Sequence, residues 1–172
     1  SRSRFRFELL GKEHDRTAFR CGVEALDRYV REQASQDQRR NIAAIHLLID
    51  TDNGSIAGYY SLSATYIRLT DLPEGLRRKF PRYGELPATL IGRLALDQAY
   101  QGQGLGDFLM LDSLHRALRN SAEIAAMAVV VDPIDDAAQR FYQRYGFEPH
   151  AGGGARLFLP MAQVAKLSPR TR

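Results

Sequence analysis

The sequence predicts a mixed α/β fold of the α+β kind, on three observations. The chain has 172 residues, which suffice for one domain with its own core and are few for two. Segments in which apolar residues recur at helical spacing alternate with short apolar runs that are typical of strands. No internal repeat, low-complexity tract or linker interrupts residues 1–172. We therefore expect a single domain.

The first half of the chain predicts a helix followed by a β-hairpin. A helix over about residues 23–39 is indicated by apolar residues at helical spacing, Val23, Leu26, Val30 and Ala34. The apolar run 42–50 and the run 56–69, which is rich in Tyr, Ile and Thr, flank an Asp-Asn-Gly turn signal. We expect these two runs to pair as antiparallel strands. The segment that follows has two turn signals and one short helix around Leu76.

The second half predicts further strands and helices in alternation. A strand over 88–97 precedes a glycine-rich loop and then a helix with a leucine face, Leu105, Leu109, Leu114 and Leu118. Residues 124–132 are apolar on both faces, as in a central strand. The next helix begins at the capping candidates Asp135 and Asp136 and ends at Gly146. Residues 154–164 are expected to form the final strand, and the tail from Lys166 to be frayed.

Composition excludes several classes of protein. The chain is 44% hydrophobic and 26% charged, as is typical of globular proteins, and no apolar run approaches the length of a membrane span. The N-terminus lacks the apolar segment of a signal peptide. The single cysteine, Cys21, can form neither an internal disulfide nor a cysteine metal cluster. We expect a cytoplasmic protein that binds no metal and no membrane.

The positive charge is concentrated in two segments. The net charge is +4, and arginines gather over 28–40 and over 68–82. Solvated helix and loop faces account for such segments in many proteins. The alternative is a surface for nucleic-acid phosphates.

Three glycines, Gly102, Gly104 and Gly106, lie close together between a predicted strand and a predicted helix. The loop fits neither the P-loop pattern nor the dinucleotide-binding pattern. Glycines let backbone N–H groups converge on a ligand, and the first turn of a helix favours an anion. The loop therefore suits a phosphate or pyrophosphate, although a turn that only reverses the chain is the simpler alternative.

The loop and the segments around it resemble the GNAT superfamily of acetyl-CoA-dependent N-acetyltransferases, over about residues 20–165. Gln101-Gly-Gln-Gly-Leu-Gly106 matches the Gln/Arg-x-x-Gly-x-Gly/Ala motif of that family, and the Asp135–Phe147 segment resembles its later helix and Tyr-Gly-Phe region. The resemblance implies a mixed, mostly antiparallel sheet of six or seven strands flanked by helices. It also implies acetyl-CoA as cofactor, bound at Leu94, Ala95, Leu96, Gln101, Gly102, Gln103, Gly104, Leu105, Gly106 and Phe141.

Softer motifs, among them Gly58-Tyr-Tyr-Ser-Leu and Gly92-Arg-Leu-Ala-Leu-Asp97, resemble the TacT-like branch of the superfamily. That resemblance implies a toxin that acetylates the α-amino group of aminoacyl-tRNA and blocks translation. It further implies a ribbon-helix-helix antitoxin as partner and a homodimer. Two alternatives stay open: a GNAT enzyme that acetylates a small amine, a polyamine or a protein N-terminus, and a module that binds coenzyme A or a partner without catalysis.

The resemblance assigns Tyr142 as the general acid that protonates the departing thiolate, a role that suits a phenol because its ordinary pKa lies near 10. A core aromatic with its hydroxyl at the surface is the alternative, and Tyr145 is the neighbour most easily confused with it. No general base is evident, and Asp97 is more typical of a capping residue. An α-amino group has a pKa of about 8, below that of a lysine, and an adjacent ester lowers it further, so the amine of an aminoacyl ester is largely uncharged near neutral pH and needs no strong base.

A tRNA substrate gives the basic segments a role. We expect acceptor-stem phosphates to contact arginines and a lysine from both segments, Arg77, Arg78, Lys79, Arg82, Arg39 and Arg40. Arg93, inside the strand before the loop, is expected at the substrate mouth, with an edge ion pair as its alternative.

Overall fold

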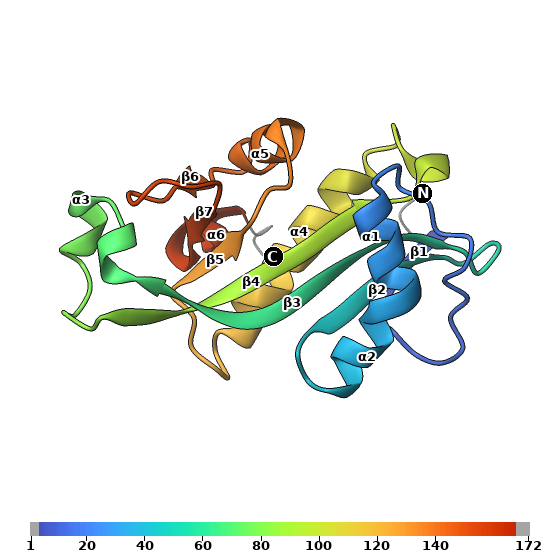
Figure 1. Cartoon of the computed structure of the whole chain (residues 1–172), viewed down its shortest axis with the longest axis horizontal. Helices are drawn as coiled ribbons and strands as arrows, with labels where there is room; N and C mark the ends of the chain where they lie inside the picture. Colours follow the sequence, from blue (N-terminus) through green and yellow to red (C-terminus); the bar gives the residue numbers. More distant parts are fainter. Residues whose placement is uncertain (1–3, 168–172) are drawn as a thin grey trace. The chain divides into compact units, whose positions relative to one another are not determined.

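The computed structural model describes residues 4–167 (Figure 1). The chain divides into two compact units. The first comprises the described residues up to Ser63 together with Gly92–Ser113, and the second comprises Ala64–Ile91 and the described residues from Leu114 onward. The strands β3 and β4 and the helix α4 each contribute to both.

Seven strands form one sheet in the order β1-β2-β3-β4-β5-β7-β6. The pair β4/β5 is parallel, and the pairs β1/β2, β2/β3, β5/β7 and β6/β7 are antiparallel. The expected mixed, mostly antiparallel sheet with flanking helices is therefore confirmed. The strand bounds are β1 Phe5–Leu9, β2 Ala44–Asp50, β3 Ile56–Arg68, β4 Glu85–Leu96, β5 Ala128–Val131, β6 Glu148–Pro149 and β7 Leu157–Pro160.

The first unit packs one helical segment on a sheet face. The predicted helix over 23–39 is present as α1 Glu24–Arg28, a π-helical turn η2 Tyr29–Gln33, and α2 Ala34–Arg39. Its buried side chains join those of the hairpin in a core that includes Tyr29, Val30, Ala34, Ile45, Leu47, Tyr59 and Ala95. Strand β1 was not expected, although its residues Phe-Arg-Phe-Glu-Leu alternate between apolar and charged, which is the pattern of a half-buried strand.

The second unit carries short helices and a second core. The connecting segment holds a 3-10 turn η3 Leu69–Asp71 and the short helix α3 Glu74–Arg77, close to the expected position. Helix α5 spans Asp136–Gln143, and the Asp135 side chain caps it by accepting from Ala138 N at 2.8 Å. The core gathers apolar side chains of β3, β4, β5 and β7 and of the connecting segment, Ile67, Leu72, Leu86, Ala88, Ala128, Val130 and Phe158.

The prediction of a final strand through residue 164 was wrong. Strand β7 ends at Pro160, and Met161–Leu167 form helix α6. The residues of α6, Met-Ala-Gln-Val-Ala-Lys-Leu, are mostly strong helix formers, and Val164 is buried without strand pairing. Lys166 and Leu167 of the predicted frayed tail therefore end a helix, and residues 168–172 lie outside the described part of the chain.

Candidate active site

The glycine-rich loop joins β4 to α4 in the first unit. Strand β4 ends at Leu96, a 3-10 turn η4 spans Gln98–Tyr100, and α4 runs over Leu105–Asn120. Gly102 and Gly104 have φ of 81° and 76°, in the left-handed region that side chains rarely adopt. A Cβ placed on either glycine would meet no atom within 4 Å, so the space beside the loop is open.

That open loop leads into the first turn of a sixteen-residue helix. The first amides of a helix have no intrahelical acceptor, and the helix dipole adds positive potential there. Open space, left-handed glycines and a helix N-terminus together fit a pyrophosphate group. The residues at this position therefore fit the phosphates of coenzyme A.

Side-chain hydrogen bonds hold both ends of the turn that precedes the loop. The Asp97 carboxylate accepts from Ala99 N and from Arg20 N, each at 2.9 Å, so Asp97 is a capping residue. Gln101 Nε2 donates to Leu96 O at 3.2 Å and to Cys21 O at 3.3 Å. The exposed Gln101 side chain thus ties the start of the loop to two backbone carbonyls.

A buried carboxylate anchors the same turn from a distant strand. Tyr100 Oη donates to Asp50 Oδ2 at 2.6 Å, and Arg4 donates to both Asp50 oxygens, at 2.6 and 2.9 Å. Asp50 is fully buried at the end of β2. The Arg4 hydrogen bond holds the pKa of Asp50 well below its ordinary value, against the opposing effect of burial. The sequence gives no sign of this group, because Asp50 and Tyr100 are distant along the chain.

The strand residues expected to bind coenzyme A lie at the end of β4. Ala95 belongs to the core of the first unit, and Leu94 and Leu96 are half-buried. In the second unit the parallel ladder between β4 and β5 ends where Ile91 pairs with Val131, so Leu94–Leu96 follow its last pair.

Tyr142 lies in the last turn of α5 in the second unit. Its ring packs against Phe141 and Phe147, with centroids 5.5 and 5.6 Å away, and 8% of the residue is exposed. Burial raises the pKa of Tyr142 well above its ordinary value, and the negative charge of Asp132 raises it further. The phenol is therefore protonated throughout the neutral range.

The Tyr142 hydroxyl differs from those of the other buried tyrosines. Within residues 4–167 it has no hydrogen-bond partner, whereas the hydroxyls of Tyr29, Tyr59, Tyr60 and Tyr100 all donate to protein oxygens. It is not among the enclosed polar atoms that lack a partner, so it keeps contact with solvent. A ligand can reach this proton donor without breaking a protein hydrogen bond.

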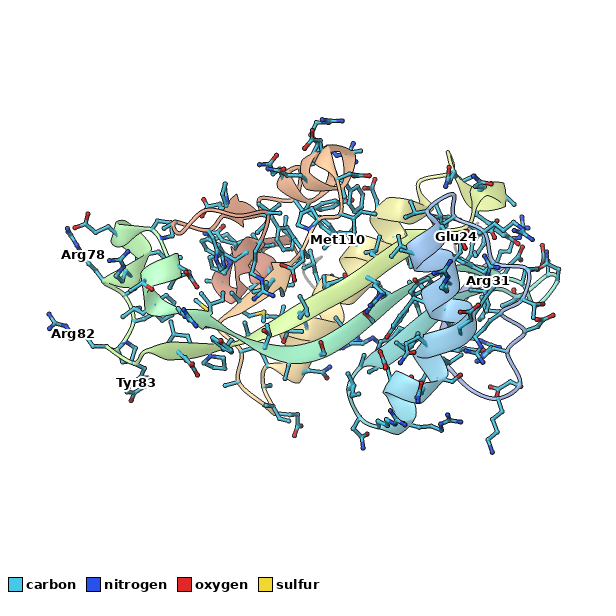
Figure 2. The ribbon with its side chains drawn as sticks, in the orientation of Figure 1. Glu24, Arg31, Arg78, Arg82, Tyr83 and Met110 are labelled. Atoms are coloured by element: carbon cyan, nitrogen blue, oxygen red, sulfur yellow. The ribbon has the colours of Figure 1, made fainter. Side chains whose placement is uncertain are left out.

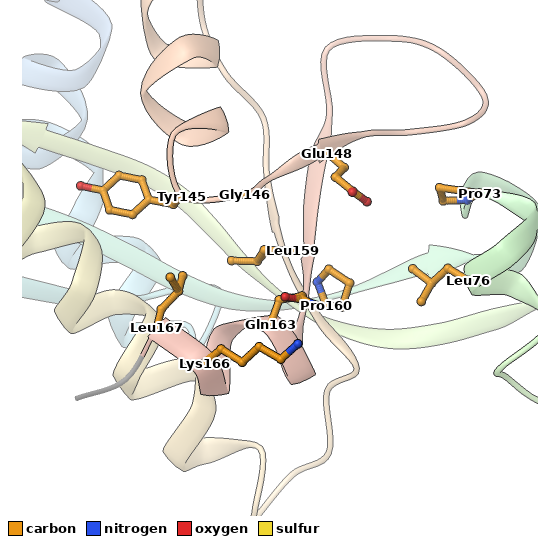
Figure 3. A pocket seen from close by; sticks show the side chains of 10 residues that line it. All are labelled: Pro73, Leu76, Tyr145, Gly146, Glu148, Leu159, Pro160, Gln163, Lys166 and Leu167. Atoms are coloured by element: carbon orange, nitrogen blue, oxygen red, sulfur yellow. The ribbon is translucent and has the colours of Figure 1, made fainter. Parts of the chain in front are cut away.

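Two features near Tyr142 were not expected from the sequence. Asp132, directly after β5, accepts a two-point hydrogen bond from Arg156 at 2.8 and 2.9 Å. Tyr145, the neighbour of Tyr142 in sequence, is half-buried and lines a cavity of about 480 Å³ with residues of β7 and α6 (Figure 3). The two tyrosines therefore have different surroundings.

The basic residues expected to contact RNA differ in their contacts: one binds backbone carbonyls, one forms a surface ion pair, and the others are exposed. Arg77 donates to Leu72 O at 3.1 Å and braces its own segment, and Arg78 pairs with Glu74 at 2.9 Å on the surface. Lys79 and Arg82 are exposed in the segment before β4, and Arg78, Arg82 and the exposed Tyr83 are labelled there in Figure 2. The remaining two, Arg39 and Arg40, are exposed at the end of α2 in the first unit.

Among residues 4–167, Arg93 forms no edge ion pair. Its guanidinium carbon lies 3.5 Å from the ring centroid of Tyr29, on the helical segment of the first unit. Its backbone N–H donates to Ser61 Oγ at 3.1 Å.

No helix within residues 4–167 combines the length and the apolar character that a membrane crossing requires. In the same range, no three His, Cys, Asp or Glu side chains group in a way that could hold a metal ion.

Known proteins resemble this chain over nearly its whole length. A probable toxin TacT of Sinorhizobium fredii is 30% identical over 161 residues, which cover 90% of this chain and 89% of the relative. A tRNA-acetylating toxin of Mycobacterium tuberculosis is 31% identical over 153 residues, which cover 89% and 90%.

Solved structures of related toxins also match this chain over nearly its whole length. AtaT complexed with acetyl-methionyl-tRNAfMet has a TM-score of 0.87 at 27% identity, covering 95% of this chain and 98% of that one. AtaTR bound with AcCoA has a TM-score of 0.84 at 27% identity, covering 96% and 98%. A mutant AtaT toxin bound to the C-terminus of the antitoxin AtaR has a TM-score of 0.81 at 25% identity, covering 98% and 99%. The model of the acetyltransferase (GNAT) family matches residues 12–147, and the chain belongs to that family.

Proposed function

We propose that this protein is an acetyl-CoA-dependent N-acetyltransferase that acetylates the α-amino group of aminoacyl-tRNA and so blocks translation. The observation that carries acetyl transfer is the buried, protonated Tyr142 with its unpartnered and accessible hydroxyl. The choice of aminoacyl-tRNA is supported by the relatives, one named a tRNA-acetylating toxin and matched over 90% of its length.

Acetyl-CoA, when bound, supplies the acetyl group as a thioester. The loop from Gln101 to Gly106 would hold its pyrophosphate through backbone N–H groups, which the left-handed Gly102 and Gly104 and the start of α4 make available. The backbone of Leu94, Ala95 and Leu96 would hold the rest of the cofactor, and Phe141 would supply an apolar contact. Side-chain hydrogen bonds of Asp97, Tyr100 and Gln101 hold the turn that precedes the loop.

Tyr142 acts as the general acid. Its Oη would give a proton to the departing thiolate sulfur as the C–S bond breaks and the C–N bond forms, and the proton lost by the amine would pass to solvent, from which the phenol recovers its own. Burial and the charge of Asp132 keep the pKa of this phenol high, so it holds its proton until the sulfur develops negative charge. No carboxylate or imidazole is required as a strong base, because an α-amino group has a pKa well below that of a lysine and the neighbouring ester lowers it further, so that the amine of an aminoacyl ester is largely uncharged near neutral pH.

The charged tRNA is held by the basic surface. The exposed Lys79, Arg82, Arg39 and Arg40 are suited to acceptor-stem phosphates, Arg78 can exchange Glu74 for a phosphate, and Arg93 lies at the substrate mouth. Arg77 contributes by bracing the segment that carries Lys79 and Arg82. These contacts give affinity that falls with salt and read no base identity.

We further infer that the protein works in the cytoplasm, as a homodimer, and is neutralised by a ribbon-helix-helix antitoxin. A structural relative bound to the C-terminus of an antitoxin supports that partner. We also infer that residues 1–172 act as one domain, because the family model spans parts of both compact units.

The test is transfer of labelled acetyl from acetyl-CoA to charged tRNA, with deacylated tRNA and a mixture of polyamines and peptides alongside. Label on charged tRNA alone is the expected result. Label on the small amines alone would overturn the tRNA substrate and retain acetyl transfer. No label on any amine would overturn the enzymatic function.

A further inference from the structure

Arg93 is held rigidly on an aromatic ring in the first unit. The guanidinium carbon lies 3.5 Å from the Tyr29 ring centroid, which is the distance of direct stacking. Tyr29 is 5% exposed and stacks in turn on Tyr59, with the two rings inclined by 23°. Tyr59 Oη donates to Leu26 O at 2.6 Å. The arginine therefore rests on a buried aromatic pair that cannot move freely.

The π-helical turn is what fixes Tyr29 in this position. Asp37 follows Tyr29 by eight residues, and in an uninterrupted α-helix it would point about 80° away around the axis. A π turn accommodates one extra residue, which brings the two side chains to within about 20° of one face. Tyr29 Oη accordingly donates to Asp37 Oδ2 at 2.8 Å, and Gln33 Nε2 donates to Asp37 Oδ1 at 2.9 Å.

The hydrogen-bonding groups of Arg93 are left without protein partners. Within residues 4–167 no acceptor lies within hydrogen-bond distance of its guanidinium, and no carboxylate within 4.0 Å. The nearby Asp37 carboxylate attracts Arg93 from beyond ion-pair distance, while its two oxygens accept hydrogen bonds from Tyr29 and Gln33. A half-buried guanidinium that is rigid, stacked and unpaired presents a fork of N–H donors along its edge, which matches a phosphate.

The coenzyme is not the source of that phosphate. Side chains alternate between the two faces of a strand, so Arg93 and Ala95 share the face packed by Tyr29, while Leu96 lies on the other. On that other face the Leu96 side chain and Leu109 of α4 both approach Gly58. Arg93 thus projects from the face opposite the helix whose N-terminus fits the pyrophosphate.

We propose that Arg93, stacked on Tyr29, binds the phosphodiester that joins the last two nucleotides of the tRNA 3′ end. The inference rests on the proposed function, which makes charged tRNA the substrate. That phosphodiester is the anionic group nearest to the aminoacyl ester, so its capture fixes the end of the chain that carries the reacting amine. Tyr29 and Asp37 are positioning residues, because they act through Arg93.

The experiment measures the Kd of intact deacylated tRNA and of the same tRNA without its terminal nucleotide, for wild type and Arg93→Met. Wild type is expected to bind the truncated RNA roughly ten-fold more weakly. Arg93→Met should bind both RNAs equally, at about the affinity of wild type for the truncated one. Its slope of log affinity against log salt should be smaller by about 0.7. Arg93→Lys should recover part of the affinity and Tyr29→Leu should lose it.

Arg28→Met is the matched control, because Arg28 is exposed and lies on the helical segment that carries Tyr29. This variant should bind both RNAs as wild type does. An unchanged Kd for acetyl-CoA in Arg93→Met checks that the variant is folded. The proposal would be overturned if removal of the terminal nucleotide weakened RNA binding equally in wild type and in Arg93→Met. It would also be overturned if Arg93→Met bound acetyl-CoA more weakly and both RNAs as tightly as wild type. Failure of the proposed function is read separately, from acetyl transfer by wild type to charged tRNA.

Discussion

Tyr100 and Tyr142 have the same exposure, 8%, and opposite surroundings. The Tyr100 hydroxyl donates to the buried Asp50 and accepts from Asn53, and Tyr100 comes directly before the glycine-rich loop. The Tyr142 hydroxyl has no partner among the described residues and keeps contact with solvent. Burial alone therefore does not distinguish a structural tyrosine from a candidate proton donor. The two differ in whether the hydroxyl is hydrogen-bonded to the protein.

The largest expected effect is that of Tyr142→Phe. Loss of the proton donor should lower kcat for acetyl transfer by about 100- to 10,000-fold. The Kd for acetyl-CoA and the melting temperature should stay near wild type, because no protein hydrogen bond is removed. Tyr145→Phe is the matched control and should retain full kcat. A Tyr142→Phe enzyme as fast as wild type would remove this residue from the mechanism.

Tyr100→Phe should show the reverse pattern. It removes a hydrogen bond to a buried carboxylate, which costs about 1.5–3 kcal/mol of unfolding free energy. Urea denaturation should reveal this loss, while kcat of the folded fraction stays close to wild type. If stability were unaffected and kcat collapsed, the roles assigned to the two tyrosines would have to be exchanged.

Gly104→Ala tests the loop that Tyr100 anchors. A Cβ at Gly104 meets no neighbour, so the expected cost is conformational, roughly 1–2 kcal/mol for a left-handed residue. We expect calorimetry to show acetyl-CoA binding weakened by about ten-fold. Gly75→Ala, on α3 and equally open, is the control and should bind as wild type. Equal affinities for both variants would contradict the role of the left-handed glycine.

The smallest effect is the dependence of stability on pH. The folded-state pKa of Asp50 is lowered, so its contribution is present above its unfolded pKa of about 3.9 and is lost as pH falls below that value. The difference in unfolding free energy between wild type and Asp50→Asn should therefore shrink as pH falls from 5 toward 2. Glu123→Gln, at an exposed site, should show no such convergence. A constant difference would contradict the Arg4–Asp50 account.

The sequence by itself determined most of the helices and strands in their order, the glycine-rich loop between β4 and α4, and Tyr142 as the candidate acid. These are local properties, because apolar periodicity, turn residues and short motifs are read within one or two turns of chain. The prediction failed at both ends of the chain: β1 was missed although its residues alternate as in a strand, and α6 was taken for part of a strand.

Only the tertiary structure decided what each buried polar group does. The contacts of Tyr100 with Asp50 and of Arg93 with Tyr29 join residues more than forty positions apart in sequence, so no local pattern records them. Arg77 resembles its basic neighbours in sequence, and only the folded geometry shows that its guanidinium donates to the nearby carbonyls of Thr70 and Leu72. Residue type fixes the chemistry that a side chain can offer, and long-range packing fixes whether that chemistry is already used by the protein or left for a ligand.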